Sequence, residues 1–215
     1  MDSKNRLGRG LASIFNTQTK LNNISIQEVR YAYYDDSSGK DDDPYDIFLS
    51  YVSDKKYGKI EDWDTSRVTD MTELFKGFKN FNKDISNWDV SNVTNMEGMF
   101  WYSDFNQPLG NWDVSNVTNM DYMFANNIKF NEDIGNWDVS NIGTMYGTFS
   151  GATSFNQDIG NWDVSKVKIM QLMFNNAKSF NQDLSKWCVL NVSIYQGFSD
   201  GSNLSNANMP LWGTC

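Results

Sequence analysis

Apolar and polar residues recur along this chain with a period near 25 residues. One stretch, NWDVSNVTNM, is present from Asn87 to Met96 and again from Asn111 to Met120, with near-copies around both. The tryptophans of the copies follow one another at steps of 25 residues, with one step of 24: Trp63, Trp88, Trp112, Trp137, Trp162, Trp187 and Trp212. A period in this range predicts a solenoid, in which each repeat is one unit stacked on the next.

Each copy changes its apolar period half-way. Around Trp88, Trp88 and Val90 alternate with polar residues, which predicts a short strand with these two side chains inward. The stretch VTNMEGMF that begins at Val93 has apolar residues at three- and four-residue steps, which predicts a short helix. Thr94 followed by Glu97 is a capping-box pattern at its start. Each copy is therefore expected to be a strand, a turn and a helix.

The apolar columns are expected to form the core. Besides tryptophan, they hold valine or isoleucine (Val68, Val93, Val117, Ile142, Val167, Val192), methionine (Met71, Met96, Met120, Met145, Met170) and phenylalanine (Phe75, Phe100, Phe124, Phe149, Phe174). A second phenylalanine column follows in the return segment (Phe81, Phe105, Phe130, Phe155, Phe180). The asparagine after each of these is expected to satisfy backbone groups of the turn through a side-chain ladder: Asn82, Asn106, Asn131, Asn156 and Asn181.

The unit FNQDISNWDVSNVTNMxxMFxxA closely resembles the repeat of the BspA-like leucine-rich-repeat surface proteins, first described as mycoplasma proteins of unknown function. The segment I-x-x-W-x-V from Ile85 to Val90 corresponds to the strand of a leucine-rich repeat, with tryptophan in place of the second leucine. The resemblance implies an α/β solenoid, a right-handed superhelix of about six strand-turn-helix coils with a parallel sheet on one face. It also implies adhesion or protein–protein interaction.

Four segments are predicted. Residues 1–23 form a basic N-terminal arm, 24–62 an N-terminal capping segment, 63–199 the solenoid, and 200–215 a C-terminal cap where the consensus decays. Within the first two, residues 6–15 are either a mobile arm or a helix that orders against a partner. Residues 24–34 are predicted to be a strand, and residues 45–52 a short helix or strand.

Composition narrows the chemistry. The formal net charge is −9, which argues against a nucleic-acid partner. The chain has no histidine, so it lacks the commonest general base and the commonest transition-metal ligand. It has no apolar run long enough for a membrane-spanning helix, and its N-terminus has only a five-residue apolar stretch, too short for a signal peptide. Because neither a signal peptide nor a membrane span is seen, a cytoplasmic or virion-associated location is favoured over secretion. Members of the resembled family are also found in large DNA viruses.

Three polar columns point outward from the predicted strand and are named here the Asn–Asp–Ser strip. Their residues are Asn87, Asp89, Ser91, Asn111, Asp113, Ser115, Asn136, Asp138, Ser140, Asn161, Asp163 and Ser165. Stacked carboxylates repel one another, so something must offset that repulsion. The alternatives are hydrogen bonds from neighbouring Asn, Ser or backbone N–H groups, a protein partner, or bound divalent cations.

The aspartates are repeat copies in equivalent environments, so nothing separates a general acid from a base, and no enzyme activity, metal or cofactor is expected. The leading hypothesis is a non-enzymatic adhesion or scaffold protein that binds a protein partner through the strip. The alternative is a structural component of a larger assembly, docked through the N-terminal arm.

The chain has two cysteines, both near its C-terminal end. Cys188 and Cys215 lie one and three positions after their tryptophans, on the same outward side of adjacent coils. They are either a disulfide that staples the last coil or two free thiols in a reducing compartment. Three N-x-S/T sequons, at Asn92, Asn116 and Asn191, arise from the repeat consensus, so glycosylation matters only if the chain is exported.

Overall fold

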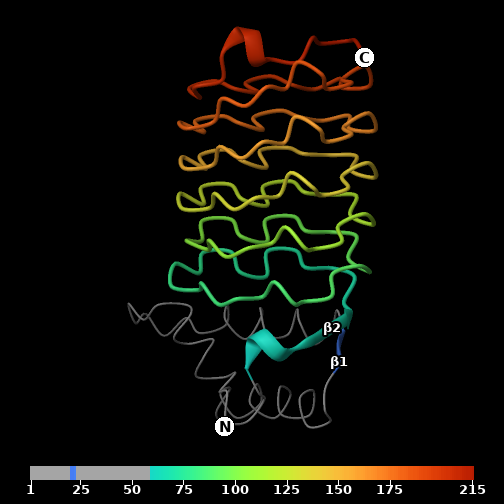
Figure 1. Cartoon of the computed structure of the whole chain (residues 1–215), viewed down its shortest axis with the longest axis vertical. Helices are drawn as coiled ribbons and strands as arrows, with labels where there is room; N and C mark the ends of the chain where they lie inside the picture. Colours follow the sequence, from blue (N-terminus) through green and yellow to red (C-terminus); the bar gives the residue numbers. More distant parts are fainter. Residues whose placement is uncertain (1–19, 23–58) are drawn as a thin grey trace, which may run out of the picture.

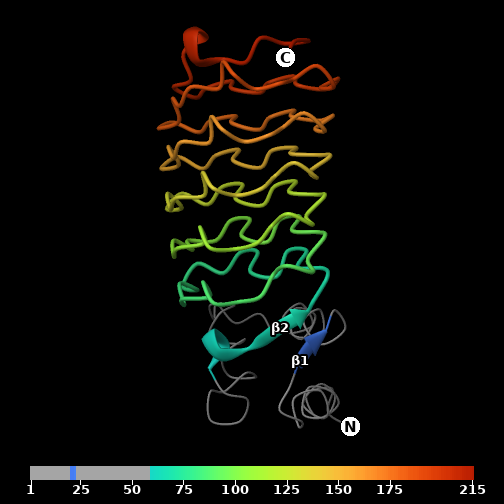
Figure 2. The ribbon, with the colours of Figure 1, turned by 45° about the vertical axis from the view of Figure 1, so that its right-hand side comes forward.

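The structure, a computed structural model, describes residues 20–22 and 59–215 as a stack of flat coils (Figure 1). At its base, strand β1 (Lys20–Asn22) pairs in parallel with strand β2 (Asp64–Arg67), next to the 3-10 helix η1 (Ile60–Asp62). The 3-10 helix η2 (Asn206–Asn208) lies at the other end, near the C-terminus (Figure 2).

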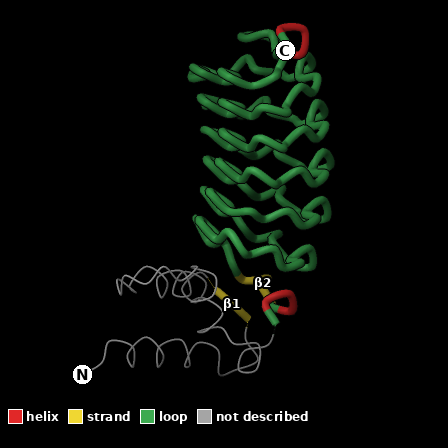
Figure 3. The backbone as a smooth tube through the Cα atoms, turned by 90° about the vertical axis from the view of Figure 1, so that its left-hand side faces the viewer, coloured by secondary structure: helices red, strands yellow, loops and turns green. Residues whose placement is uncertain are grey.

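The predicted α/β solenoid of strand-turn-helix coils with a parallel sheet is wrong. Among the described residues, the only helices are the three-residue η1 and η2, and the only sheet is the pair β1–β2. The coils between them are loops and turns throughout (Figure 3). Successive coils share only one isolated parallel bridge each, as at Asn95 and Asn119, and these bridges open the segment that was predicted to be a helix.

The segment after each bridge is not a helix because its amide groups point in two directions. The Phe100 N–H donates to the Met123 carbonyl of the next coil at 2.8 Å. The Met99 N–H instead donates to the Met96 carbonyl at 3.2 Å, which closes a tight turn within its own coil. An α-helix would send both amides back four residues along the same chain. Coil-to-coil hydrogen bonds therefore replace intrahelical ones.

Two left-handed residues in each coil, four positions apart, account for this path. Their φ angles lie between 52° and 79°. They are Glu73, Gly77, Gly98, Tyr102, Tyr122, Asn126, Gly147, Gly151, Leu172, Asn176, Gly197 and Gly201. A positive φ at the third position of a turn is what a type II turn requires, and it ends any α-helix. Successive turns thus repeat the apolar spacing that resembles a helix.

Two features favour glycine at position 147. Its φ is 58°, and an added Cβ would lie 2.8 Å from the Tyr122 ring of the preceding coil. We expect Gly147→Ala to lower the free energy of unfolding by about 2–3 kcal/mol, the sum of left-handed strain and overpacking. Gly77→Ala is the matched control, since Gly77 has a φ of 79° but nothing within 4 Å of its Cβ position. It should cost only about 1 kcal/mol in denaturant unfolding. Equal losses in the two variants would refute the contact.

The predicted core is confirmed, except that Trp63 and Trp212, at the two ends of the tryptophan column, are only partly buried. The tryptophans from Trp88 to Trp187 are at most 4% exposed, and the two phenylalanine columns are fully buried. The Phe124 ring stacks on Phe100 and Phe149, with centroid distances of 5.6 Å to each. Each of the tryptophans from Trp88 to Trp187 also donates its indole N–H to a carbonyl of the preceding coil, as from Trp137 to Leu109 at 2.9 Å. These tryptophans therefore fill the core and also hydrogen-bond one coil to the next.

The predicted asparagine ladder is confirmed. The Asn131 backbone N–H donates to Oδ1 of Asn106 at 2.8 Å, and the same bond recurs from copy to copy. The predicted capping box is wrong, because no helix follows it. Thr94 Oγ1 donates instead to the Thr69 carbonyl of the preceding coil at 3.2 Å. The Glu97 N–H takes Asn95 Oδ1 as its acceptor, at 3.1 Å.

Several predicted elements lie outside the described residues: the helix at 6–15, the strand at 24–34 and the segment 45–52. Of the predicted arm, only β1 is described. At the other end, the segment 200–215 follows the 181–189 side of the last coil, where the Leu184 N–H donates to the Asn208 carbonyl at 2.9 Å. The described part of the chain holds no helix with the length and hydropathy of a membrane span.

Candidate interaction strip

The Asn–Asp–Ser strip lies on the outside of the coils. In each of its four copies the asparagine and aspartate are exposed and the serine is half-buried, while the Trp and Val between them are buried. The alternating burial predicted around Trp88 is therefore confirmed, although the backbone is a turn and not a strand. The four copies carry the same three polar residues in the same register.

Each aspartate of the strip closes a local turn with the serine two residues later. Ser91 donates both its N–H (3.0 Å) and its Oγ–H (2.6 Å) to Oδ1 of Asp89. The serine N–H makes the same bond at Asp113, Asp138 and Asp163, at 3.0 to 3.1 Å. This is an Asx turn, in which the side chain mimics a backbone carbonyl. The predicted local hydrogen bonds are confirmed, and they occupy only one oxygen of each carboxylate.

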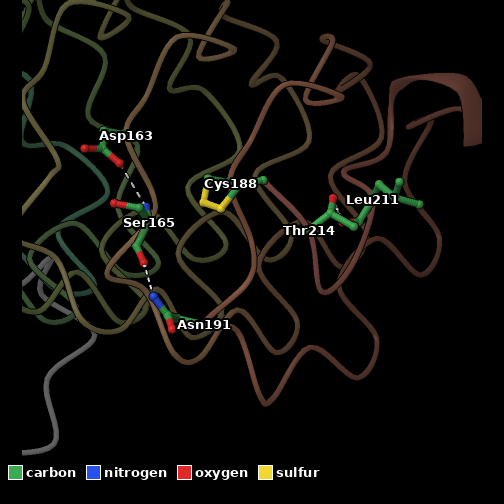
Figure 4. Close-up of a disulfide and its surroundings, with 7 residues drawn as sticks. Asp163, Ser165, Cys188, Asn191, Leu211 and Thr214 are labelled. Atoms are coloured by element: carbon green, nitrogen blue, oxygen red, sulfur yellow. Dashed lines mark hydrogen bonds between the residues drawn. A yellow bond between two sulfur atoms is a disulfide. The ribbon is translucent and has the colours of Figure 1, made fainter.

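A second set of bonds ties the strip from coil to coil. The Asn191 side-chain amide donates to the Ser165 carbonyl at 2.8 Å, below the turn formed by Asp163 (Figure 4). Asn92 and Asn116 make the same contact with the serine of the preceding coil, at 2.9 and 2.7 Å. The sequon asparagines therefore have a structural task. Their hydrogen bonds fix the position of each serine, and of the aspartate bonded to it, relative to the next coil.

The first asparagine of each copy is the part of the strip left available. The side chains of Asn87, Asn111, Asn136 and Asn161 are exposed and make no hydrogen bond within the described residues. Each amide offers donors and an acceptor beside the second oxygen of an aspartate. Four such pairs, one per coil, form a regular polar surface with fixed backbone geometry.

The turns also set the acid response of the strip. Hydrogen bonds from Ser140 hold the pKa of Asp138 below its usual value, and those from Ser165 do the same for Asp163. A carboxyl whose pKa is lower in the folded than in the unfolded chain stabilises the fold above the unfolded value, near 4, and this stability is lost as pH falls through the folded pKa.

We therefore expect the free energy of unfolding to fall as the pH drops below about 4. The double variant Asp138→Asn/Asp163→Asn keeps Oδ1 as acceptor but does not titrate, so its unfolding midpoint in urea should fall less steeply with pH than that of the wild-type chain. Identical pH slopes for the two proteins would show that these turns contribute nothing to acid sensitivity.

In the structure a disulfide joins Cys188 to Cys215 (Figure 4). Cys188 stands in the column that holds aspartate in the preceding copies. Beside it, the Val189 N–H donates to the Thr214 carbonyl at 2.9 Å. The bond attaches the last residues of the chain to the coil of Trp187.

Comparison with known proteins supplies a family. Residues 46–134 and 101–212 both match a family model described as "Mycoplasma protein of unknown function, DUF285", and together the matches span most of the chain. The chain belongs to the DUF285 family. No curated protein and no solved structure matches it significantly. The match establishes a mycoplasma-type repeat protein and does not reach the finer BspA-like assignment.

The sequence reading missed one surface group of this DUF285 protein. Trp101, Tyr102, Tyr122 and Tyr146 come from three successive copies, and their rings lie against one another. They occupy positions at which the copies differ, so the consensus did not contain them. The available signal was the excess of aromatic residues at otherwise small or polar positions. Within residues 20–22 and 59–215, no three potential metal-ligating side chains gather in one place.

Proposed function

We propose that this DUF285 protein is a non-enzymatic scaffold that binds a protein partner through the Asn–Asp–Ser strip. The observation that carries the proposal is the column of exposed, unbonded side-chain amides at Asn87, Asn111, Asn136 and Asn161. Coil-to-coil hydrogen bonds hold the neighbouring aspartates in register, so a partner that contacts the strip pays little ordering entropy. Repetition gives the same contact several times along one line.

The chemistry of the strip favours a protein over other partners. Exposed carboxylates and a net charge of −9 repel a nucleic-acid backbone. The aspartates share one environment, so none is set apart as an acid, a base or a nucleophile, and no cofactor is required. A row of amide and carboxylate groups can hydrogen-bond to the backbone of a protein partner and bind its basic side chains. Insertion into a membrane is not expected.

The likeness of the repeat unit to BspA-like surface proteins supports the same class of function. That finer relationship, and the adhesion role it implies, belong to the proposal. A cytoplasmic or virion-associated location likewise belongs to the proposal.

The test uses the full chain as bait and compares two double variants. Asp113→Ala/Asp138→Ala removes both the charge and the turn acceptor, whereas Asp113→Asn/Asp138→Asn keeps the acceptor and removes only the charge. Proteins captured by the wild-type chain should be reduced by both variants. Undiminished capture by the alanine variant, with its fold intact by circular dichroism, would rule out the strip.

The alternative is a structural component of a larger assembly, docked through the basic N-terminal arm. Its support is the charge of residues 1–20, where Lys4, Arg6, Arg9 and Lys20 stand against Asp2. Deleting residues 1–19 keeps β1 and its pairing with β2. Loss of assembly with a folded stack would favour this alternative, and retained assembly would reject it.

A further inference from the structure

A column of stacked side chains runs along the coils at the left-handed turns. The Lys76 ammonium lies 4.0 Å from the Trp101 ring centroid. The Trp101 ring stacks on Tyr122 at 4.9 Å with an interplanar angle of 10°, and Tyr122 meets Tyr146 edge-on at 4.8 Å. These four residues come from four successive coils. Tyr102, beside Trp101 at 5.8 Å, is 48% exposed.

The column departs from the repeat. The positions of Trp101 and Tyr102 are taken by Ser150 and Gly151 two copies later, and by Asn175 and Asn176 in the copy after that. Residues that recur for packing are the same in every copy, whereas these large rings appear only in this part of the stack. Their size is therefore not needed to build a coil.

Carboxylates surround the rings. Glu73 holds the Lys76 ammonium at 2.9 Å, so Lys76 is bound by a ring and a carboxylate together. Glu97 and Asp121 have no cationic partner in the part of the chain that the structure describes. Burial, a hydrogen bond with Tyr146 and the charges of neighbouring groups, including Asp121 and Glu97, raise the pKa of Tyr122. The region therefore has an excess of negative charge.

We propose that the aromatic row (Trp101, Tyr102, Tyr122 and Tyr146) is a second docking surface, which takes an arginine- or lysine-bearing segment of a protein partner. The row already binds one cation of its own chain, Lys76, through a ring and a carboxylate. Asp121 accepts hydrogen bonds from Thr144 and Tyr146 and Glu97 accepts one from Asn119, yet within the described residues neither carboxylate has a cationic partner. Aromatic rings near such carboxylates attract a guanidinium or ammonium group by both cation–π and charge interactions. This surface is independent of the Asn–Asp–Ser strip.

A carbohydrate is a poorer fit for the same rings. Trp101 has Lys76 against its ring at 4.0 Å and Tyr122 stacked on it at 4.9 Å. A sugar ring that stacks on an indole needs a free face. An approaching cationic side chain can use the exposed Tyr102 ring, and Tyr and Trp are among the residues that most often dominate protein interfaces.

The test compares two matched double variants of the full chain. Trp101→Ser/Tyr102→Gly gives this copy the residues of Ser150 and Gly151, and glycine suits the φ of 59° at position 102. Asn175→Ser/Asn176→Gly makes the same two residues in a copy outside the row, where position 176 has a φ of 56°. Both variants are therefore expected to fold, and thermal unfolding checks that they do.

The probe is an arginine-rich dodecapeptide, measured by calorimetry at physiological ionic strength, where long-range charge attraction is screened. Its partner probe carries citrulline, a neutral analogue, in place of each arginine. The wild-type chain should bind the arginine peptide and not the citrulline peptide. Trp101→Ser/Tyr102→Gly should weaken binding by about tenfold or more, while Asn175→Ser/Asn176→Gly should leave it unchanged.

Either of two results would overturn the proposal: no binding by the wild-type chain, or equal affinity in the two double variants. The strip variant Asp113→Asn/Asp138→Asn separates this outcome from the proposed function. If the peptide bound through the strip, that variant would lose affinity while the aromatic variant kept it.

Discussion

Replacing Gly135 with alanine is expected to lower the free energy of unfolding by about 2–3 kcal/mol, because the added methyl group meets the backbone of the next coil. A Cβ at Gly135 would lie 2.5 Å from the Asp158 carbonyl oxygen, and Gly160 has the same relation to Asp183. A backbone carbonyl cannot rotate away as a flexible side chain does. The whole coil must move, which weakens the hydrogen bonds that hold the stack.

Gly143→Ala is the control for this prediction. A Cβ added at Gly143 would lie 3.8 Å from the Thr118 carbonyl oxygen, an ordinary contact distance, and the φ of Gly143 lies outside the left-handed region. We expect a change within about 0.5 kcal/mol in denaturant unfolding. If Gly135→Ala were as well tolerated as Gly143→Ala, the coils could not be as closely stacked as the structure shows.

Truncating Phe124 to alanine should cost about 3–5 kcal/mol, the usual range for a fully buried aromatic residue. Its ring is 0% exposed, and its centroid lies 3.9 Å from that of Phe130 in the same coil. It also stacks on Phe100 and Phe149 of the coils before and after it. The cavity would therefore interrupt the ring stack in the middle of the protein. Unfolding in guanidinium chloride measures the loss.

Ile128→Ala is the matched truncation on the surface. Ile128 is 48% exposed and lies two residues from Phe130, so it samples the same coil without the buried stack. Its change should stay within about 0.5 kcal/mol. A loss for Phe124→Ala no greater than that of Ile128→Ala would contradict a core built from stacked phenylalanines.

The sequence predicted which side chains are buried but not the backbone that buries them. Apolar residues at three- and four-residue steps suit an α-helix, and they suit equally a series of turns that repeats every four residues. Gly147 and Gly197 stand inside the predicted helices, and Gly151 and Gly201 follow four residues later. Glycine costs about 1 kcal/mol in a helix interior, so such pairs were evidence for left-handed turns.

The predicted strand failed for a related reason. The alternation at Trp88 and Val90 is real, but the Trp88 N–H donates to the Ile85 carbonyl at 3.0 Å and closes a turn. A coil of turns presents alternate residues to the core without pairing as a strand. The Asp-x-Ser spacing carried the missing signal, because an aspartate that accepts a hydrogen bond from the residue two positions on favours a turn.

The candidate strip followed from the sequence, whereas the aromatic row did not. Reading by column finds what every copy shares, and the strip is part of the consensus. Trp101 and Tyr122 differ from their equivalents in other copies. Their contact depends on the height of one coil above the next, which only the structure supplies.

Hydrogen-bond scalar couplings measured by NMR on the labelled full chain test the central claim, that the coils are joined by backbone hydrogen bonds and contain no helix. The account predicts a coupling from the Tyr122 amide nitrogen to the carbonyl carbon of Tyr146, whose oxygen accepts its hydrogen at 2.8 Å. A coupling from Tyr122 to the carbonyl of Thr118, four residues earlier, would show an α-helix and contradict the account.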